Sequence, residues 1–227
     1  MSKDFSPIQT SLGQQVVEYL RERIYNVEIS PGTQLNAVDI SKQLGISRSP
    51  VRDALLILAA EGLVEQASNS GYKVIDFNES LVKDVFAVRL ALEPIALREG
   101  MMRFGPSFLT DHKELWSNLD ADSISNQDWR EIYVVADNKL HETIMNASEN
   151  RLLREVLEKI IKIVMAIRHW QFLHGTPREE IVLTQEEHLH IFASVESGDV
   201  DKAVEALITH IETSRHRALS RFEDRDD

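Results

Sequence analysis

The chain has 227 residues, of which 43% are hydrophobic and 27% are charged, and its formal net charge at pH 7 is −12. This composition is typical of a helix-rich globular protein and excludes a largely disordered chain. The acidic balance argues against a protein that coats nucleic acid without regard to sequence, because phosphate binding needs basic surface. The chain contains no cysteine, so disulfides and thiolate metal ligands are excluded as well.

Neither a signal peptide nor a membrane span is expected. The start, MSKDFSPIQTS, is too polar for a secretory signal, and the longest unbroken apolar run, ALLILAA at 54–60, is too short to cross a bilayer. We therefore expect a cytoplasmic protein with no membrane partner. Residues 1–77 hold 7 basic and 9 acidic side chains, whereas residues 78–227 hold 18 basic and 28 acidic ones. The net negative charge therefore lies mainly in the C-terminal two thirds of the chain.

The first 77 residues have the pattern of a winged helix-turn-helix. Apolar residues recur every fourth position from Leu12 to Ile24, which predicts an amphipathic helix. After a turn at SPGTQL, a short helix is expected over 37–44, and a second helix is expected to begin at a cap formed by Ser47 or Ser49. The segments LVEQ and YKVIDF, separated by ASNSG, predict a two-stranded wing. The alternative is a small protein-interaction module.

The remainder of the chain predicts helices only. Helical periodicity runs through six segments, at about 79–100, 107–119, 128–147, 150–173, 178–197 and 199–223. Six helices of this length favour an antiparallel bundle. The predicted fold class is therefore mainly α, with a winged helix-turn-helix domain over 8–77 and an all-α six-helix bundle over 78–222.

A cationic cluster opens the second helix of the helix-turn-helix. Arg48 and Arg52 lie four residues apart and hence on one face, with Ser47 and Ser49 beside them. The second helix of such a motif enters the major groove, where arginine can bind guanine O6 and N7 and serine can bind phosphate. On spacing alone, a surface helix whose Arg52 pairs with a neighbouring acid is an equally good interpretation.

Four potential metal ligands fall on apolar helix faces. Asp137 and His141 are four residues apart in one predicted helix, and His188 and His210 lie in the apolar stripes of two others. Such ligands suit one divalent transition metal, namely zinc, nickel or manganese. Ordinary core hydrogen bonding is an equal alternative by spacing alone, since the chain has 8 histidines. A metal site should lose affinity as the pH falls through the imidazole range near about 6.5.

The segment LNxxxISxxLGISRSPVRDALxxLxxEGLV, which spans 35–64, resembles the DNA-binding domain of the GntR family of bacterial transcription regulators. The resemblance implies that Arg48, Ser49 and Arg52 contact the operator. It also implies that the backbone of Gly71, at the tip of the wing, meets the minor groove.

Two positions depart from the GntR pattern. Many relatives carry an arginine where this chain has Val38, and many carry a basic residue where it has Ser70. Each departure removes a DNA contact. The affinity or the operator sequence is therefore expected to differ from that of other members.

The helical part contains DxxxH followed by ASENRLL, then EEHxxIFASVESGD and a later HI. With these motifs it resembles the FCD ligand-binding domain of the FadR subfamily of GntR regulators. Together the two resemblances cover about residues 8–222. In metal-containing FCD domains an Asp and three His hold the ion, and they correspond to Asp137, His141, His188 and His210 without substitution. Acyl-CoA-binding members lack this set, so a fatty acyl effector is not expected.

The FCD resemblance implies a small organic acid bound at or beside the metal. Arg89 resembles a recurring FCD arginine that would clamp the carboxylate, although an ion pair with Glu93 is an equal alternative. Arg168 is a second candidate on the same grounds.

We therefore expect a homodimeric transcription regulator, not an enzyme, whose affinity for operator DNA is controlled by a small carboxylate at a metal-containing pocket. Dimerisation is expected because paired half-sites multiply specificity. One alternative is a metal-dependent enzyme that uses the same Asp and His residues, but no further base lies at a suitable spacing, since Glu142 should point away. A structural metal bundle is a third interpretation, and it gives Arg48 and Arg52 no role.

Overall fold

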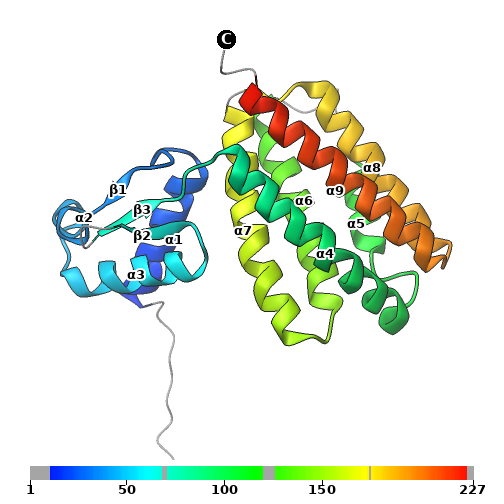
Figure 1. Ribbon diagram of the computed structural model, residues 1–227, viewed down its shortest axis with the longest axis horizontal. Coiled ribbons are helices and arrows are strands. Elements are labelled where there is room, and N and C mark those ends of the chain that lie inside the picture. The colour runs from blue at the N-terminus through cyan, green and yellow to red at the C-terminus, as the bar shows by residue number, and fades with distance from the viewer. Residues whose placement is uncertain (1–10, 68–70, 120–125, 174, 224–227) are drawn as a thin grey trace, which may run out of the picture. The chain divides into compact units, whose positions relative to one another are not determined.

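The computed structural model of the protein describes residues 11–67, 71–119, 126–173 and 175–223 (Figure 1). The chain forms two compact units that divide between Asp76 and Phe77. Most of the described residues are helical, and the strands are confined to the first unit. The predicted mainly α class is confirmed.

The first unit is a winged helix-turn-helix. Its elements are α1 (Leu12–Tyr25), β1 (Gln34–Leu35), α2 (Ala37–Leu44), α3 (Arg48–Ala60), β2 (Val64–Ala67) and β3 (Gly71–Val74). Strand β3 lies in the centre of the sheet and pairs antiparallel with β1 and β2. The hairpin was expected, but β1 was not, because two residues are too short to produce an alternating pattern. The segment expected to be only a turn therefore ends in a third strand.

Local signals set the ends of the two short helices. The side chain of Asn36 accepts a hydrogen bond from the Val38 N–H at 2.8 Å and so caps α2. Gly45 ends α2 with a φ of 66°, in the left-handed region that glycine adopts without a steric penalty. Ser47 precedes α3 as its N-cap but forms no side-chain cap hydrogen bond. Its hydroxyl is exposed beside the start of α3.

The second unit is a bundle of helices. It contains α4 (Glu79–Phe104), α5 (Thr110–Ser117), α6 (Asn126–Ala147), α7 (Arg151–Leu173), α8 (Arg178–Glu196) and α9 (Val200–Glu223), as the six periodic segments predicted. Helix α4 packs against α6, α7 and α9, while α8 lies against α9 and α5 (Figure 1). No described helix combines the length and the apolar character that crossing a membrane requires.

A glycine allows two helices of the bundle to approach closely. A Cβ atom added at Gly100 of α4 would lie 2.7 Å from the Cβ of Ala147 at the end of α6. Any larger residue would force the two helices apart. The same two helices carry Glu93 and His141, whose side chains contact each other at 2.7 Å.

Candidate DNA-binding surface and metal centre

The predicted DNA-contacting residues converge on one groove of the first unit. The groove has a volume of about 670 Å³ and lies between the start of α2, helix α3 and the wing. Arg48, Arg52, Val38 and Gly71 all line it. Ser47 and Ser49 are exposed beside it, and Ser70 lies outside the described residues.

Both arginines of the groove are exposed. In the described part of the first unit, the acids that form ion pairs do so with Arg21, Arg23 and Lys73 instead. The interpretation of Arg52 as one half of a surface ion pair therefore has no support here. The two cations remain available for an anionic ligand, and the groove could accept a nucleic-acid backbone and base edges.

The four predicted metal ligands meet in the interior of the helical unit. Asp137 and His141 come from α6, His188 from α8 and His210 from α9, and all four side chains are buried. One ligand atom from each lies within 4.8 Å of those of the other three.

The spacing of the donor atoms suits a small cation. The Nε2 atom of His210 lies 3.2 Å from Nε2 of His188 and 3.3 Å from Nε2 of His141. Asp137 completes the group, with Oδ1 at 3.4 Å from His188 Nε2 and Oδ2 at 3.8 Å from His141 Nε2. Zinc lies about 2.0–2.1 Å from such ligands, which separates neighbouring donors by roughly 3.0–3.4 Å. The residues present therefore fit a divalent ion.

Burial favours the neutral form of all three imidazoles. Burial lowers the pKa of His141, and it holds the pKa of His188 well below its usual value. Burial also lowers the pKa of His210 to about 3, although the hydrogen bond to Glu187 acts in the opposite direction. Neutral imidazole is the form that binds metal ions.

The sequence pattern of the FCD domain matches residues 84–213, which is more than half of the chain. The sequence pattern of the bacterial regulatory proteins of the gntR family matches residues 12–74. The chain belongs to the GntR family. The resemblance stated from its motifs, a GntR regulator of the FadR subfamily with an FCD domain, is confirmed. The family consists of transcription regulators, so the alternative of a metal-dependent enzyme is not supported.

Relatives of this GntR regulator match along most of their length. The HTH-type transcriptional repressor RspR of Escherichia coli (strain K12) is 26% identical over 204 residues, which cover 88% of this chain and 86% of that protein. Among solved structures, E. coli McbR/YncC has a TM-score of 0.74 at 19% identity and covers 94% of this chain and 100% of its own. The Zn²⁺-bound FCD domain of TM0439 has a TM-score of 0.53 at 23% identity, and the match covers 63% of this chain and 95% of that domain's chain. At these identities the two solved structures establish a shared fold.

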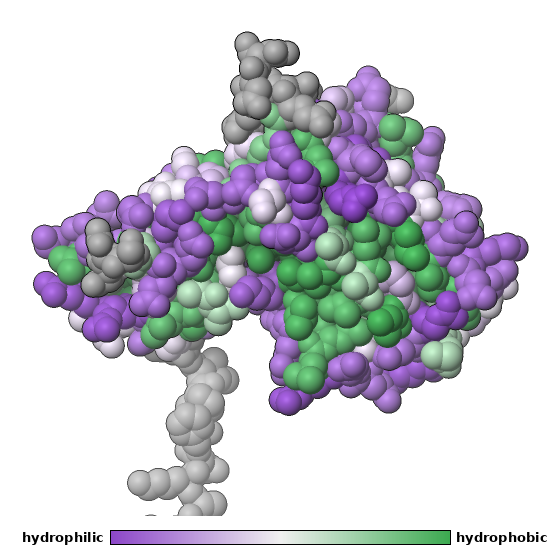
Figure 2. Space-filling view, in the orientation of Figure 1, coloured by the Kyte–Doolittle hydropathy of each residue, from purple (hydrophilic) through white to green (hydrophobic). Residues whose placement is uncertain are grey.

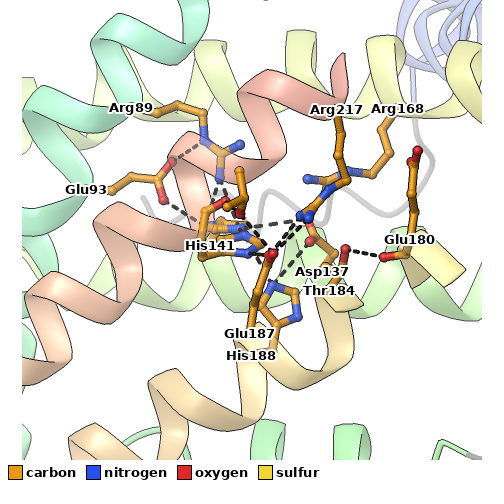
Figure 3. A network of polar contacts seen from close by, with 12 residues as sticks. Arg89, Glu93, Asp137, His141, Arg168, Glu180, Thr184, Glu187, His188 and Arg217 are labelled. Atoms are coloured by element: carbon orange, nitrogen blue, oxygen red, sulfur yellow. Dashed lines mark hydrogen bonds and ion pairs between the residues drawn. The ribbon is translucent and has the colours of Figure 1, made fainter. Parts of the chain in front are cut away.

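Two arginines of the FCD domain face the ligand cluster (Figure 3). Arg89 pairs with Glu93, with Nε 2.6 Å from Oε1, and its Nη2 also lies 3.0 Å from Nε2 of His141. Arg168 contacts Asp137, and burial lowers its pKa to about 10. The ion pair that was weighed as an alternative role for Arg89 is therefore present, but the same guanidinium also reaches the cluster.

Several residues around the cluster were missed by sequence reasoning. Glu187, Arg217 and Thr213 form a hydrogen-bonded group with His210. The ring of Trp116 packs edge-on against that of His188, with centroids 4.2 Å apart. Arg217 follows His210 by seven residues, two helical turns, and that spacing is the one signal that could have identified it. Glu142 is exposed, as expected.

Proposed function

We propose that this GntR regulator binds operator DNA as a homodimer and that a small organic acid, bound at a divalent transition metal in the FCD domain, controls its DNA affinity. The proposed ligands are Asp137, His141, His188 and His210. The observation that carries the proposal is the convergence of four buried donors on one point, and the lowered pKa values of the imidazoles agree with it. A regulator that acts on bacterial operators would work in the cytoplasm.

The metal part of the proposal rests on donor chemistry. Three imidazoles and one carboxylate suit zinc, nickel or manganese. Within the described residues, Asp137 Oδ1 accepts no hydrogen bond although it is fully buried, a costly arrangement that a cation would relieve. The Zn²⁺-bound FCD domain of TM0439, which shares this fold, adds support. When bound, the ion would supply positive charge and open coordination positions for an anion.

The carboxylate part rests on the two arginines. Arg89 has 1% of its surface exposed, and its Nη1 has no hydrogen-bond partner among the described residues. Arg168 is also buried, and its lowered pKa reflects the loss of hydration. A carboxylate near the cluster would accept hydrogen bonds from both guanidinium groups, and arginine binds carboxylates with well-defined geometry.

The homodimer is supported by apolar side chains on the surface of the helical unit. Ile95 and Met102 of α4 are 47% and 70% exposed, and Leu152 and Val156 of α7 are 63% and 45% exposed. Helices α4 and α7 pack against each other, and Figure 2 shows hydrophobic residues gathered on this face. A contiguous apolar area marks an interaction surface, and a second copy would also place two recognition helices on paired half-sites.

The experiment uses the full chain loaded with zinc and a duplex that the protein selects from a randomised pool. Acetate, lactate, malate and citrate are added in turn, and DNA affinity is measured by fluorescence anisotropy. At least one acid is expected to change the affinity by about 5- to 150-fold, the usual range of allosteric coupling. The effect should disappear in EDTA and in Arg89→Gln. No response to any of these acids in the zinc-loaded protein would contradict the proposal, and a long-chain acyl-CoA serves as the negative control.

The lowered histidine pKa values predict a pH-dependent stability in the presence of EDTA. Unfolded imidazole has a pKa of about 6.5, so below that pH the unfolded state binds more protons and folding stability falls. For each histidine that stays neutral when folded, the loss between about pH 7.5 and about pH 5.5 is roughly 1 to 1.5 kcal/mol. This loss of stability is measured by urea unfolding monitored through tryptophan fluorescence, because all three tryptophans belong to the helical unit. A flat profile would contradict the prediction.

The same pKa values change one expectation from the sequence. Metal affinity was expected to fall as the pH drops through about 6.5. Because burial lowers all three imidazole pKa values, protons compete less with a metal ion for the folded site at that pH. The fall in metal affinity is therefore expected at a lower pH.

A further inference from the structure

Two glutamates each contact the Nδ1 atom of one imidazole of the cluster, and Figure 3 labels both of them beside it. Glu93 of α4 lies with Oε2 at 2.7 Å from Nδ1 of His141. Glu187 of α8 lies with Oε2 at 2.8 Å from Nδ1 of His210. In each case Nδ1 contacts a carboxylate. Nε2 of His210 faces Nε2 of both His188 and His141, at 3.2 and 3.3 Å. Arg89 Nη2 lies beside both ring nitrogens of His141, at 3.1 Å from Nδ1 and 3.0 Å from Nε2, and because it can only donate it suits an acceptor at Nε2.

Each glutamate is held in turn by an arginine. Arg89 donates from Nε to Oε1 of Glu93 at 2.6 Å, and this pair is almost fully buried. Arg217 binds both oxygens of Glu187, at 2.7 and 2.8 Å, and the side chains of this pair are 20% and 19% exposed. Thr213 adds a third hydrogen bond to Glu187, at 2.8 Å. Neither carboxylate can turn away without breaking its ion pair.

Each carboxylate is held in an ion pair with an arginine: Arg89 Nε lies 2.6 Å from Oε1 of Glu93, and Arg217 binds both oxygens of Glu187 at 2.7 and 2.8 Å. A carboxylate paired with a guanidinium group in this way is ionised. An ionised carboxylate only accepts hydrogen bonds. The Nδ1 atom opposite each glutamate must therefore carry the proton, which leaves the lone pair on Nε2.

We propose that Glu93 and Glu187 are positioning residues that fix His141 and His210 in the tautomer with Nδ1 protonated, so that both Nε2 lone pairs point at the metal position. The inference rests on the proposed metal site and deepens it. His188 differs, because its Nδ1 has no hydrogen-bond partner among the described residues and its ring is held by packing against Trp116. Two ligands are thus oriented by hydrogen bonds and one by van der Waals contact.

The first measurement is the zinc affinity of the full chain in competition with a chromogenic chelator. Glu187→Gln is expected to weaken zinc binding by about 10- to 100-fold, the usual effect of removing a partner of a ligating histidine. Glu180→Gln is the matched control, because Glu180 also lies on α8 and pairs with an arginine, Arg221, at 2.7 Å, but contacts no histidine in the described structure. Its zinc affinity should not change.

A further variant separates the imidazole hydrogen bond from the ion pair. Arg217→Gln removes the ion pair but keeps the carboxylate on His210, so it is expected to lose less zinc affinity than Glu187→Gln. Equal losses in the two variants would overturn the proposal, because the ion pair alone would then account for the effect.

The second measurement reads the tautomer directly, from nitrogen NMR spectra of labelled histidine side chains in protein treated with EDTA. His210 is expected to be protonated on Nδ1 in the wild type and to gain the Nε2-protonated form in Glu187→Gln. An Nε2 proton in the wild type, or an unchanged spectrum in the variant, would overturn the proposal. This measurement needs no metal. If the wild type bound no zinc, the proposed metal function would be refuted, but the spectra would still show which nitrogen of His210 carries the proton.

Glu93→Gln tests the buried glutamate but leaves Arg89 without its carboxylate, so its helix content and cooperative unfolding are checked first. A folded Glu93→Gln is expected to change the tautomer of His141 as Glu187→Gln changes that of His210, and an unchanged His141 would overturn the assignment. If Glu93→Gln does not fold, the proposal is tested by the zinc affinity and the His210 tautomer of Glu187→Gln, because Glu187 is the more exposed of the two glutamates.

Discussion

Replacing Arg48 or Arg52 by alanine is expected to weaken specific operator binding by about 1 to 3 kcal/mol, which is roughly a 5- to 150-fold loss of affinity. Both side chains are exposed and line the groove between α2, α3 and the wing. Each can bind the O6 and N7 atoms of a guanine with two hydrogen bonds. Since neither is part of the core, circular dichroism and thermal unfolding should be unchanged. Fluorescence anisotropy with the selected duplex, repeated at several salt concentrations, measures the effect.

Lys42→Ala is the control for loss of one positive charge. Lys42 is exposed in the last turn of α2 and does not line the groove. Its replacement should reduce binding to all sequences alike, or not at all, while the arginine variants should lose discrimination between the selected duplex and a scrambled one. If both arginine variants bound the selected duplex with the affinity and salt dependence of the wild type, α3 would not be the recognition helix.

Replacing His188 or His210 by alanine is expected to abolish stoichiometric binding of one divalent ion. In the wild type, chelation should lower the free energy of unfolding by about 2.7 kcal/mol when the free metal stands at 100 times its dissociation constant. The variants should lack this metal-dependent increment, because three donors around a buried point hold an ion far less tightly than four. Elemental analysis of purified protein and thermal unfolding with and without EDTA measure both effects.

His190→Ala is the matched control for the metal prediction. His190 lies two residues from His188 on the same helix but is exposed, so its replacement should leave both the metal content and the thermal shift unchanged. The prediction would be contradicted if the wild-type protein contained no stoichiometric metal and showed no thermal shift on addition of zinc, nickel or manganese. The four residues would then be core residues that form ordinary hydrogen bonds.

Much of the fold could be predicted because the signals are local. The stripe from Leu12 to Ile24 predicted α1, and α2 spans Ala37–Leu44, the range expected from the sequence. The apolar faces around His188 and His210 correctly predicted that both histidines are buried. These features depend on residues within one or two helical turns of each other, where the period of the helix fixes which side chains share a face.

Other features could not be predicted, because they depend on contacts between distant segments. Strand β1 exists only because its backbone pairs with β3, which lies more than thirty residues further along the chain. The contact of Arg168 with Asp137 joins α7 to α6.

The sequence by itself predicted the two-unit organisation, the helix proposed to read DNA and the four candidate metal ligands, since each follows from periodicity or from a contiguous motif. Only the tertiary structure decided that the four ligands converge within 4.8 Å and that Glu187, a residue without any motif of its own, contacts His210 from the neighbouring helix. The physical reason is that helical periodicity defines which face of a helix is buried, whereas the rotation and axial offset of one helix against another depend on side-chain packing across the whole core.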